Sequence, residues 1–175
     1  MLPKHFECSV EKNVTQADVV LLDEQKILFK KPLWLDLGGI AKGFAVDLVI
    51  HFLRKNEIHS AIVNAGGDLR ILGKHAEKIC VRHPKNPIEL LEIGELANGA
   101  IATSSSYFSE KMHNSQIVNA LINPFSRQAN LKKNSYSVIA PCAYIADALT
   151  KVVALSGDPD HPCLKKFAAQ AFVIE

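Results

Sequence analysis

The spacing of hydrophobic positions along the chain predicts two main helices. Between Ile40 and about Asn56, apolar residues recur every three or four positions, at 40, 41, 44, 45, 48, 49 and 52. This spacing is typical of an amphipathic helix with one face in the core. The stretch 142–157 repeats the pattern, and Gly157 stands where a C-terminal cap is expected. A shorter helix is expected near residues 161–169.

Short apolar runs between turn signals predict strands. They lie at residues 18–22, 26–29, 33–37, 60–73 (two strands), 78–84, 88–104 (two strands), 116–124, 136–141 and 171–175. Gly66-Gly67 predicts the turn within 60–73, and Asn98-Gly99 predicts a hairpin within 88–104. The order of elements predicts a single α+β domain over residues 1–175, with a mostly antiparallel sheet packed by two main helices.

Composition narrows the class of protein. The 175 residues are 48% hydrophobic and 22% charged, which is ordinary for one globular domain. Twenty basic and eighteen acidic residues give a net charge of +2, too balanced for a nucleic-acid surface. Four widely spaced cysteines predict reduced thiols. With no signal core and no run near ~18 apolar residues, we expect a cytoplasmic protein, or a periplasmic one if the chain is a fragment of a longer exported protein.

The stretch LDLGGIAKGFAVD, residues 35–47, is the first candidate for chemistry. Gly38 and Gly39 lie where a predicted strand becomes a helix, and Lys42 lies in the first helical turn. Free amides at a helix start and a nearby ammonium suit an anion such as a phosphate. An alternative of equal weight is that the glycines only permit close packing and Lys42 faces solvent.

Three further groups of polar residues interrupt apolar elements. Residues 64–68, NAGGD, form a turn or a ligand site, and a turn is favoured. Residues 102–106, ATSSS, bind a ligand or cap a following helix, and capping is favoured. Asp147 lies among small apolar residues of a helix, so its carboxylate needs a cation. Either a metal ion or Lys151, four residues later, supplies it, and the local ion pair is favoured.

Taken in order, these blocks resemble the ApbE family of FAD:protein FMN transferases. LDLGGIAKGFAVD, NAGGDLRILG, IATSSSYF and VIAPCAYIADALTKVVALSG each match a block of that family, over roughly residues 33–157. The resemblance implies FAD as substrate and a magnesium ion beside its diphosphate. It implies that the FAD-binding residues are Asp36, Gly38, Lys42, Gly66, Gly67, Asp68, Thr103, Ser104 and Leu121. It implies that the metal ligands are the Gly39 carbonyl, Asp147 and a threonine at position 151.

The chain departs from the family pattern at several of these places. Position 151 is lysine, and Ala120 and Asn123 replace the histidine and aspartate of another block. About thirty residues precede the first block, fewer than is usual, so we expect an open sheet edge and a homo-oligomer or a partner subunit. The function implied is FMN transfer onto a threonine or serine of an acceptor flavoprotein. The alternatives are a flavin- or nucleotide-binding relative without transfer, and a structural subunit completed by a partner.

Overall fold

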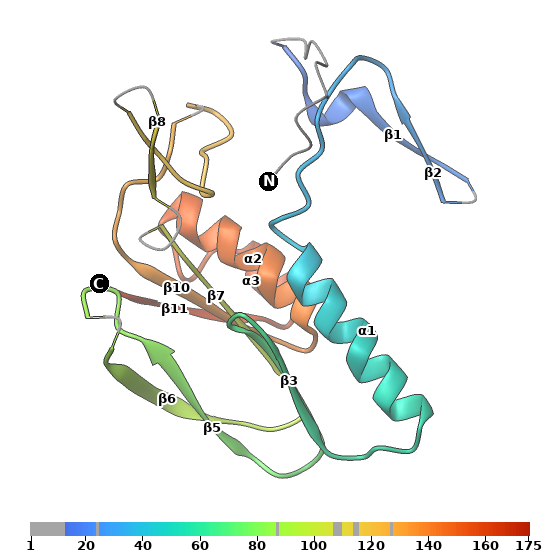
Figure 1. The fold of residues 1–175 in the computed structure, drawn as a ribbon, viewed down its shortest axis with the longest axis vertical. Coiled ribbons are helices and arrows are strands. Elements are labelled where there is room, and N and C mark those ends of the chain that lie inside the picture. The colour runs from blue at the N-terminus through green and yellow to red at the C-terminus, as the bar shows by residue number, and fades with distance from the viewer. Residues whose placement is uncertain (1–12, 24, 87, 107–109, 114–115, 127) are drawn as a thin grey trace. The chain divides into compact units, whose positions relative to one another are not determined.

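A computed structural model describes residues 13–23, 25–86, 88–106, 110–113, 116–126 and 128–175 (Figure 1). The chain divides into two compact units, Met1–Leu37 and Gly38–Glu175, and each is described by itself. The prediction of a single domain stays a prediction.

In the described residues of the first unit, 13–23 and 25–37, the structure has one short helix and one hairpin. A 3-10 helix, η1 (Gln16–Asp18), leads into the antiparallel strands β1 (Val19–Leu22) and β2 (Lys26–Phe29). The strand predicted at 33–37 is wrong, because these residues are irregular. No described strand pairs with them, so the alternating apolar side chains lack the hydrogen-bonded ladder that defines a strand.

The second unit is built on a five-stranded antiparallel sheet. Its order is β11 (Gln170–Ile174), β10 (Ser135–Ala140), β7 (Ala100–Ser105), β4 (Asp68–Leu72) and β3 (Ala61–Ala65). The helices α1 (Ala41–Lys55) and α2 (Ala143–Ser156) cover one face (Figure 1). The α+β prediction with two main helices is confirmed.

The side of α1 that meets the sheet is not the predicted one. The buried residues are Gly43, Val46 and Ile50, whereas Phe44, Leu48 and Phe52 are more than half exposed. Both sides of the helix are apolar, so periodicity alone does not decide which side is buried. The side carrying Gly43 has the smallest side chain, and this allows α1 to approach its neighbours most closely.

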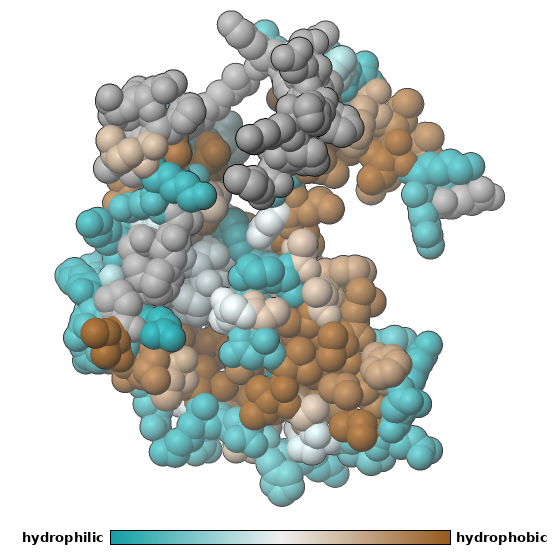
Figure 2. Space-filling view, viewed as in Figure 1, coloured by the Kyte–Doolittle hydropathy of each residue, from teal (hydrophilic) through white to brown (hydrophobic). Residues whose placement is uncertain are grey.

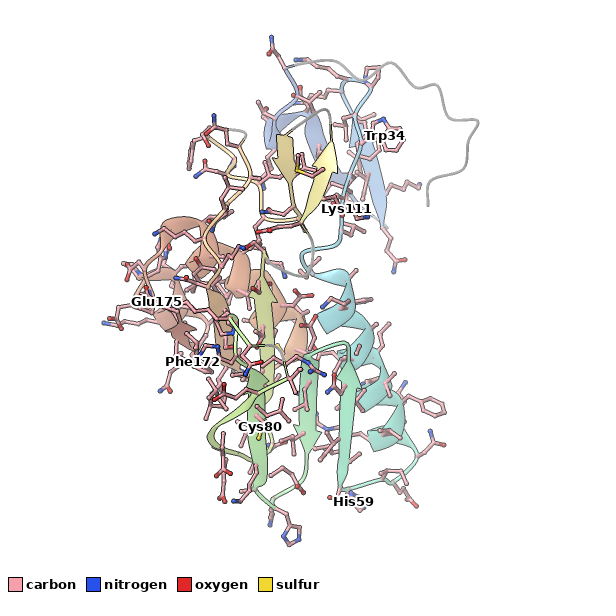
Figure 3. All side chains as sticks on the ribbon, turned by 60° about the vertical axis from the view of Figure 1, so that its left-hand side comes forward. Trp34, His59, Cys80, Lys111, Phe172 and Glu175 are labelled. Carbon is pink, nitrogen blue, oxygen red and sulfur yellow. The ribbon has the colours of Figure 1, made fainter. Side chains whose placement is uncertain are left out.

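A separate hairpin lies on the other face of the sheet. Strands β5 (Glu77–Arg82) and β6 (Leu90–Leu96) pair with each other, and their buried Ile79 and Val81 pack on Ile71 and Ile101 of the sheet. Phe172 of β11 packs against the same cluster (Figure 3). The core therefore has two layers, one on each side of the five strands.

The hairpin predicted at Asn98-Gly99 is wrong. Strand β6 pairs with β5, and β7 pairs with β4 and β10. Asn98 adopts a φ of 44°, and the Gly99 carbonyl accepts a hydrogen bond from the Ile71 amide at 2.8 Å. The Asn-Gly turn thus passes the chain from one sheet into the next, an outcome that local turn chemistry cannot distinguish from a hairpin.

The remaining elements are short. Strands β8 (Lys111–His113) and β9 (Gln116–Val118) pair with each other. The strand predicted at 116–124 ends at Val118, because the side chain of Asn119 accepts from the Leu121 amide and donates to the Asn130 carbonyl. The helix near 161–169 is one turn, α3 (Cys163–Lys166). Gly157 caps α2 with a φ of 73°, as predicted. Among the described residues, no helix is long and apolar enough to cross a membrane.

Candidate functional site

The two main helices cross at Gly43. A Cβ atom added there would lie 2.3 Å from the Ala143 carbonyl oxygen and 2.7 Å from the Tyr144 Cα, both backbone atoms of α2. Real Cβ atoms essentially never lie this close to backbone, so only glycine fits. The close packing predicted for glycines concerned Gly38 and Gly39, so the tight contact at Gly43 was not foreseen. A Cβ on Gly39 would make an ordinary 3.6 Å contact with Cε of Lys151.

Each helix supplies a carboxylate to the start of the other. Asp147 of α2 accepts a hydrogen bond from the Gly43 amide at 3.1 Å, in the first turn of α1. Asp47 of α1 accepts from the Ala143 and Tyr144 amides, at 3.1 Å and 2.9 Å, in the first turn of α2. These carboxylates satisfy amides that have no acceptor within their own helix and favour the positive end of the helix dipole.

The first turn of α1 therefore does bind an anionic group. That group is the carboxylate of Asp147, which satisfies one of the free amides, that of Gly43. The sequence analysis missed Asp47 and Gly43. The signal that could have revealed Asp47 is a carboxylate among apolar residues of a predicted helix, because such a group needs hydrogen-bond donors when it is buried. Arg70 of β4 pairs with Asp47 and holds it in place.

Lys42 and Asp68 form an ion pair beside this crossing. Lys42 Nζ lies 2.8 Å from Asp68 Oδ2; the Lys42 side chain is half-exposed, and Asp68 is 1% exposed. Burial raises the pKa of Asp68, the Asp147 charge raises it further, and Lys42 opposes both. An ammonium fixed by a buried carboxylate and open to solvent on its other side is suited to meet an anionic ligand.

The turn between β3 and β4 positions Asp68. Ala65 pairs with Asp68, which leaves Gly66 and Gly67 as a two-residue loop with φ values of 63° and 103°. Positive φ at both positions is the type I′ pattern that joins twisted antiparallel strands. The predicted turn is confirmed, and it presents Asp68 as the first residue of β4.

Asp147 and Lys151 form the second ion pair of the site. Asp147 is fully buried, and Lys151 Nζ contacts Asp147 Oδ1 and also donates to the Asp147 carbonyl oxygen at 3.0 Å. The favoured local ion pair is confirmed. The Thr150 hydroxyl donates to the same carbonyl at 2.7 Å and bonds Ser104 Oγ at 2.7 Å. The Thr150 side chain is buried between α2 and β7.

These residues do not fit the magnesium site that the resemblance implies. One carboxylate oxygen of Asp147 holds an ammonium, and the other accepts an amide hydrogen. A divalent ion prefers several oxygen ligands and is repelled by an ammonium among them. Within the described part of the chain, no group of three or more His, Cys, Asp or Glu side chains is placed to hold a metal.

The hydroxyl run at residues 103–106 lies on both faces of the sheet. Ser104 faces α2, whereas Thr103 bonds Ser137 on the opposite face, at 2.8 Å between their hydroxyl oxygens. Ser105 and Ser106 donate to the carbonyls of Asn134 and Lys132. The prediction that these residues cap a helix is wrong, because β7 includes Ser105 and its hydroxyls tie neighbouring segments together.

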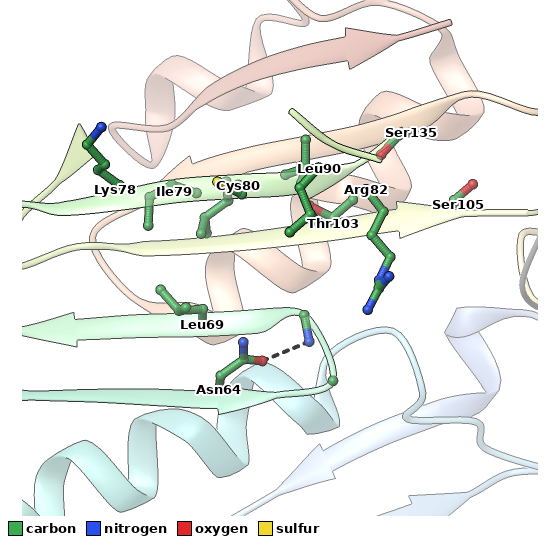
Figure 4. Close-up of a pocket in the computed structure, with 14 residues that line it drawn as sticks. Asn64, Leu69, Lys78, Ile79, Cys80, Arg82, Leu90, Thr103, Ser105 and Ser135 are labelled. Carbon is green, nitrogen blue, oxygen red and sulfur yellow. Dashed lines mark hydrogen bonds between the residues drawn. The ribbon is translucent and has the colours of Figure 1, made fainter. Parts of the chain in front are cut away.

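A cavity of about 650 Å³ opens on the face that Thr103 shares (Figure 4). Its walls combine the Gly66-Gly67 turn, apolar side chains of the core layer between the sheet and the β5–β6 hairpin, and hydroxyls of β7 and β10. Ser135 Oγ is buried there and has no hydrogen-bond partner among the described residues. A cavity of this size with a few polar groups is typical of a small-molecule site.

Three predicted residues stand apart from this arrangement. Leu121 is 4% exposed and packs in the main core, so it offers little surface to a ligand. Asp36 belongs to the first unit and Gly38 to the turn before α1. The roles expected of all three stay predictions.

This geometry defines a class of protein. It is an α+β domain in which two helices cross near their starts, beside two lysine–aspartate ion pairs. The sequence model of the ApbE family matches residues 3–171, so the chain belongs to the ApbE family. The crystal structure of the ApbE protein from Thermotoga maritima aligns with a TM-score of 0.74 and 26% identity, over 90% of this chain and 54% of that one.

Two curated relatives carry the name FAD:protein FMN transferase. The protein from Rhodobacter capsulatus is 29% identical over 139 residues, which cover 78% of this chain and 26% of that protein. The protein from Vibrio cholerae is 26% identical over 165 residues, which cover 90% of this chain and 49% of that protein. The chain thus spans about half or less of the length of these relatives.

Proposed function

We propose that this chain binds FAD and takes part in transferring its FMN half to a hydroxyl of an acceptor protein. Family membership and relatives named FAD:protein FMN transferase support the reaction class. The observation that carries the proposal is the half-exposed Lys42 ammonium, held by buried Asp68 beside the start of α1. This arrangement offers a positive charge of fixed position to a diphosphate.

The reaction is a displacement at phosphorus. The acceptor oxygen forms a bond to the phosphorus of the FMN half, and the bond from that phosphorus to the bridging oxygen breaks. AMP leaves with the bridging oxygen, and the hydroxyl proton passes to solvent. Lys42 would offset negative charge that develops on the diphosphate, and the helix-start amides would orient it.

The cavity of about 650 Å³ is the place we propose for a ring system of FAD. Gly66, Gly67 and Thr103 line it, and Asp68 follows the Gly66-Gly67 turn directly in the chain. Apolar walls suit the faces of a ring, and hydroxyls suit its polar edges. Of the predicted FAD-binding residues, Lys42 and Asp68 form a charged group, and Gly66, Gly67 and Thr103 line the cavity.

The test is mass spectrometry of a threonine-bearing acceptor peptide incubated with the protein and FAD, with and without magnesium. We expect a gain equal to FMN less one water, together with AMP. Lys42→Ala should weaken FAD binding by about 1–3 kcal/mol, the size of a charge-assisted contact. Lys55→Ala, in the last turn of the same helix, is the matched control. Equal affinity of both variants for FAD would refute the role of Lys42.

We also propose that the exposed side of α1 is covered by a second protein surface, in a homo-oligomer or with a partner subunit. Phe44, Leu48 and Phe52 follow one another at intervals of four residues and are 54%, 53% and 64% exposed. Hydrophobic surface gathers over this helix in Figure 2. A helix that is apolar on both sides is typical of a buried position, and contiguous exposed apolar surface is typical of an interface.

A further inference from the structure

The carboxylate of Asp147 has a complete set of partners from this chain alone. Oδ2 accepts from the Gly43 amide at 3.1 Å, and Oδ1 pairs with the Lys151 ammonium. Asp147 is fully buried, so a partner for its charge is required rather than optional. Lys151 meets this requirement from the next turn of the same helix.

The Lys151 side chain also lies against the turn before α1. Its Cε would be 3.6 Å from a Cβ on Gly39, and its Nζ makes a second hydrogen bond, to the Asp147 carbonyl. The side chain is 27% exposed, so the ammonium is fixed on one side and open to solvent on the other. Thr150, the neighbouring hydroxyl, is buried and directed at Ser104.

We infer that the Lys151 ammonium is a built-in cation that takes the place of the divalent ion, so that this chain binds a nucleotide diphosphate without magnesium. The nucleotide part of this inference rests on the proposed function. Lys42 and Lys151 each neutralise one buried carboxylate and each retain an exposed side. A diphosphate placed against both meets two ammonium groups, whose hydrogen bonds to phosphate oxygens are charge-assisted.

A divalent ion at Asp147 would have to displace Lys151. The displaced ammonium would remain within a side chain's length of the ion and repel it. Ammonium also lacks any lone pair for coordination. The wild-type site is therefore closed to the metal by charge and by occupancy of the carboxylate.

The first experiment measures metal binding without nucleotide. Electron paramagnetic resonance of added Mn²⁺ should show no bound ion in the wild-type chain beyond that in Asp147→Asn. Lys151→Thr should bind Mn²⁺ at least tenfold more tightly than wild type, and Lys151→Met, which lacks the hydroxyl, should gain less. One Mn²⁺ bound by wild type and lost in Asp147→Asn would overturn the inference. A Lys151→Thr chain with the native circular dichroism spectrum and no gain would overturn it too.

The second experiment measures FAD and ADP binding to the wild-type chain by calorimetry, in magnesium and in EDTA. We expect dissociation constants that agree within twofold. A tenfold loss of affinity in EDTA would overturn the inference and leave the proposed function intact. Failure of FAD to bind in either buffer would instead refute the proposed function, and the Mn²⁺ measurements would still decide the role of Lys151.

Discussion

Replacing Gly43 by alanine tests the closest contact between the two helices. The new Cβ would lie 2.3 Å from the Ala143 oxygen, 2.6 Å from its carbonyl carbon and 2.7 Å from the Tyr144 Cα. All three are backbone atoms, so no side chain can rotate away. To reach ordinary contact, α1 and α2 must separate by about 1 Å, and such overpacking typically costs about 1–3 kcal/mol.

The separation also stretches the hydrogen bonds that cross this contact. Asp147 would lose the Gly43 amide, and Asp47 would move from the Ala143 and Tyr144 amides. One weakened charge-assisted bond adds about 1.5–3 kcal/mol, and the better helix propensity of alanine returns about 1 kcal/mol. We therefore expect Gly43→Ala to lower the free energy of unfolding by about 1.5–5 kcal/mol.

Urea denaturation followed by circular dichroism measures this loss. Gly39→Ala is the matched control, because its Cβ meets only the flexible Lys151 side chain at 3.6 Å and it has no positive φ. Ala143→Gly should not rescue Gly43→Ala, since the clash is with backbone. A Gly43→Ala chain within about 0.5 kcal/mol of wild type, inside the ordinary range for surface substitutions, would refute the reasoning.

Three further predictions concern the charged residues and the exposed helix face. Asp47→Ala should lower the free energy of unfolding by about 2–4 kcal/mol, because it removes the cap of α2 and leaves Arg70 without its carboxylate. Urea denaturation should show a smaller loss for Asp47→Asn, and equal losses in the two variants would contradict the charge argument. Because the pKa of Asp68 is raised, its contribution to stability is fully present below the ordinary value of 3.8 and is lost as pH rises through the folded-state pKa. The stability of wild type relative to Asp68→Asn should therefore fall as the pH rises above 3.8 in urea titrations, and a rise would show that Lys42 outweighs burial. Leu48→Glu should lower the mass measured by light scattering if α1 forms an interface between copies of the chain. A wild-type chain that is a monomer, and whose unfolding curve is the same alone and in cell extract, would contradict both the proposed homo-oligomer and the proposed partner subunit.

Elements whose stability depends on local chemistry were predictable from the sequence. The Gly66-Gly67 loop requires positive φ at two positions, and Gly157 caps α2 in the left-handed region, so residue type alone points to both structures. The Asp147–Lys151 pair was equally accessible because it spans one helical turn.

Features that depend on distant segments were not predictable in this way. The buried side of α1 is decided by contact with Ala143, a hundred residues away, and the Asn98-Gly99 turn by the pairing of β6 with β5. Apolar spacing favours both sides of α1, and turn chemistry does not specify which strand comes next. The wrong assignments for 33–37 and for the hydroxyl run have the same origin, since partners outside the segment decide its structure.

The crossed carboxylates connect the fold to the chemistry proposed for it. The start of a helix is a ready site for a phosphate, yet here Asp147 occupies the Gly43 amide, so the protein has used part of that site for its own packing. In the proposed site, the positive charge offered to a ligand is consequently carried by the Lys42 and Lys151 side chains, each held by a buried aspartate. Because those aspartates lie on β4 and α2 while Lys42 lies on α1, the crossing at Gly43 fixes the distance between the two ammonium groups. Substitutions at the crossing should therefore change nucleotide affinity as well as stability, even though Gly43 carries no side chain to touch a ligand.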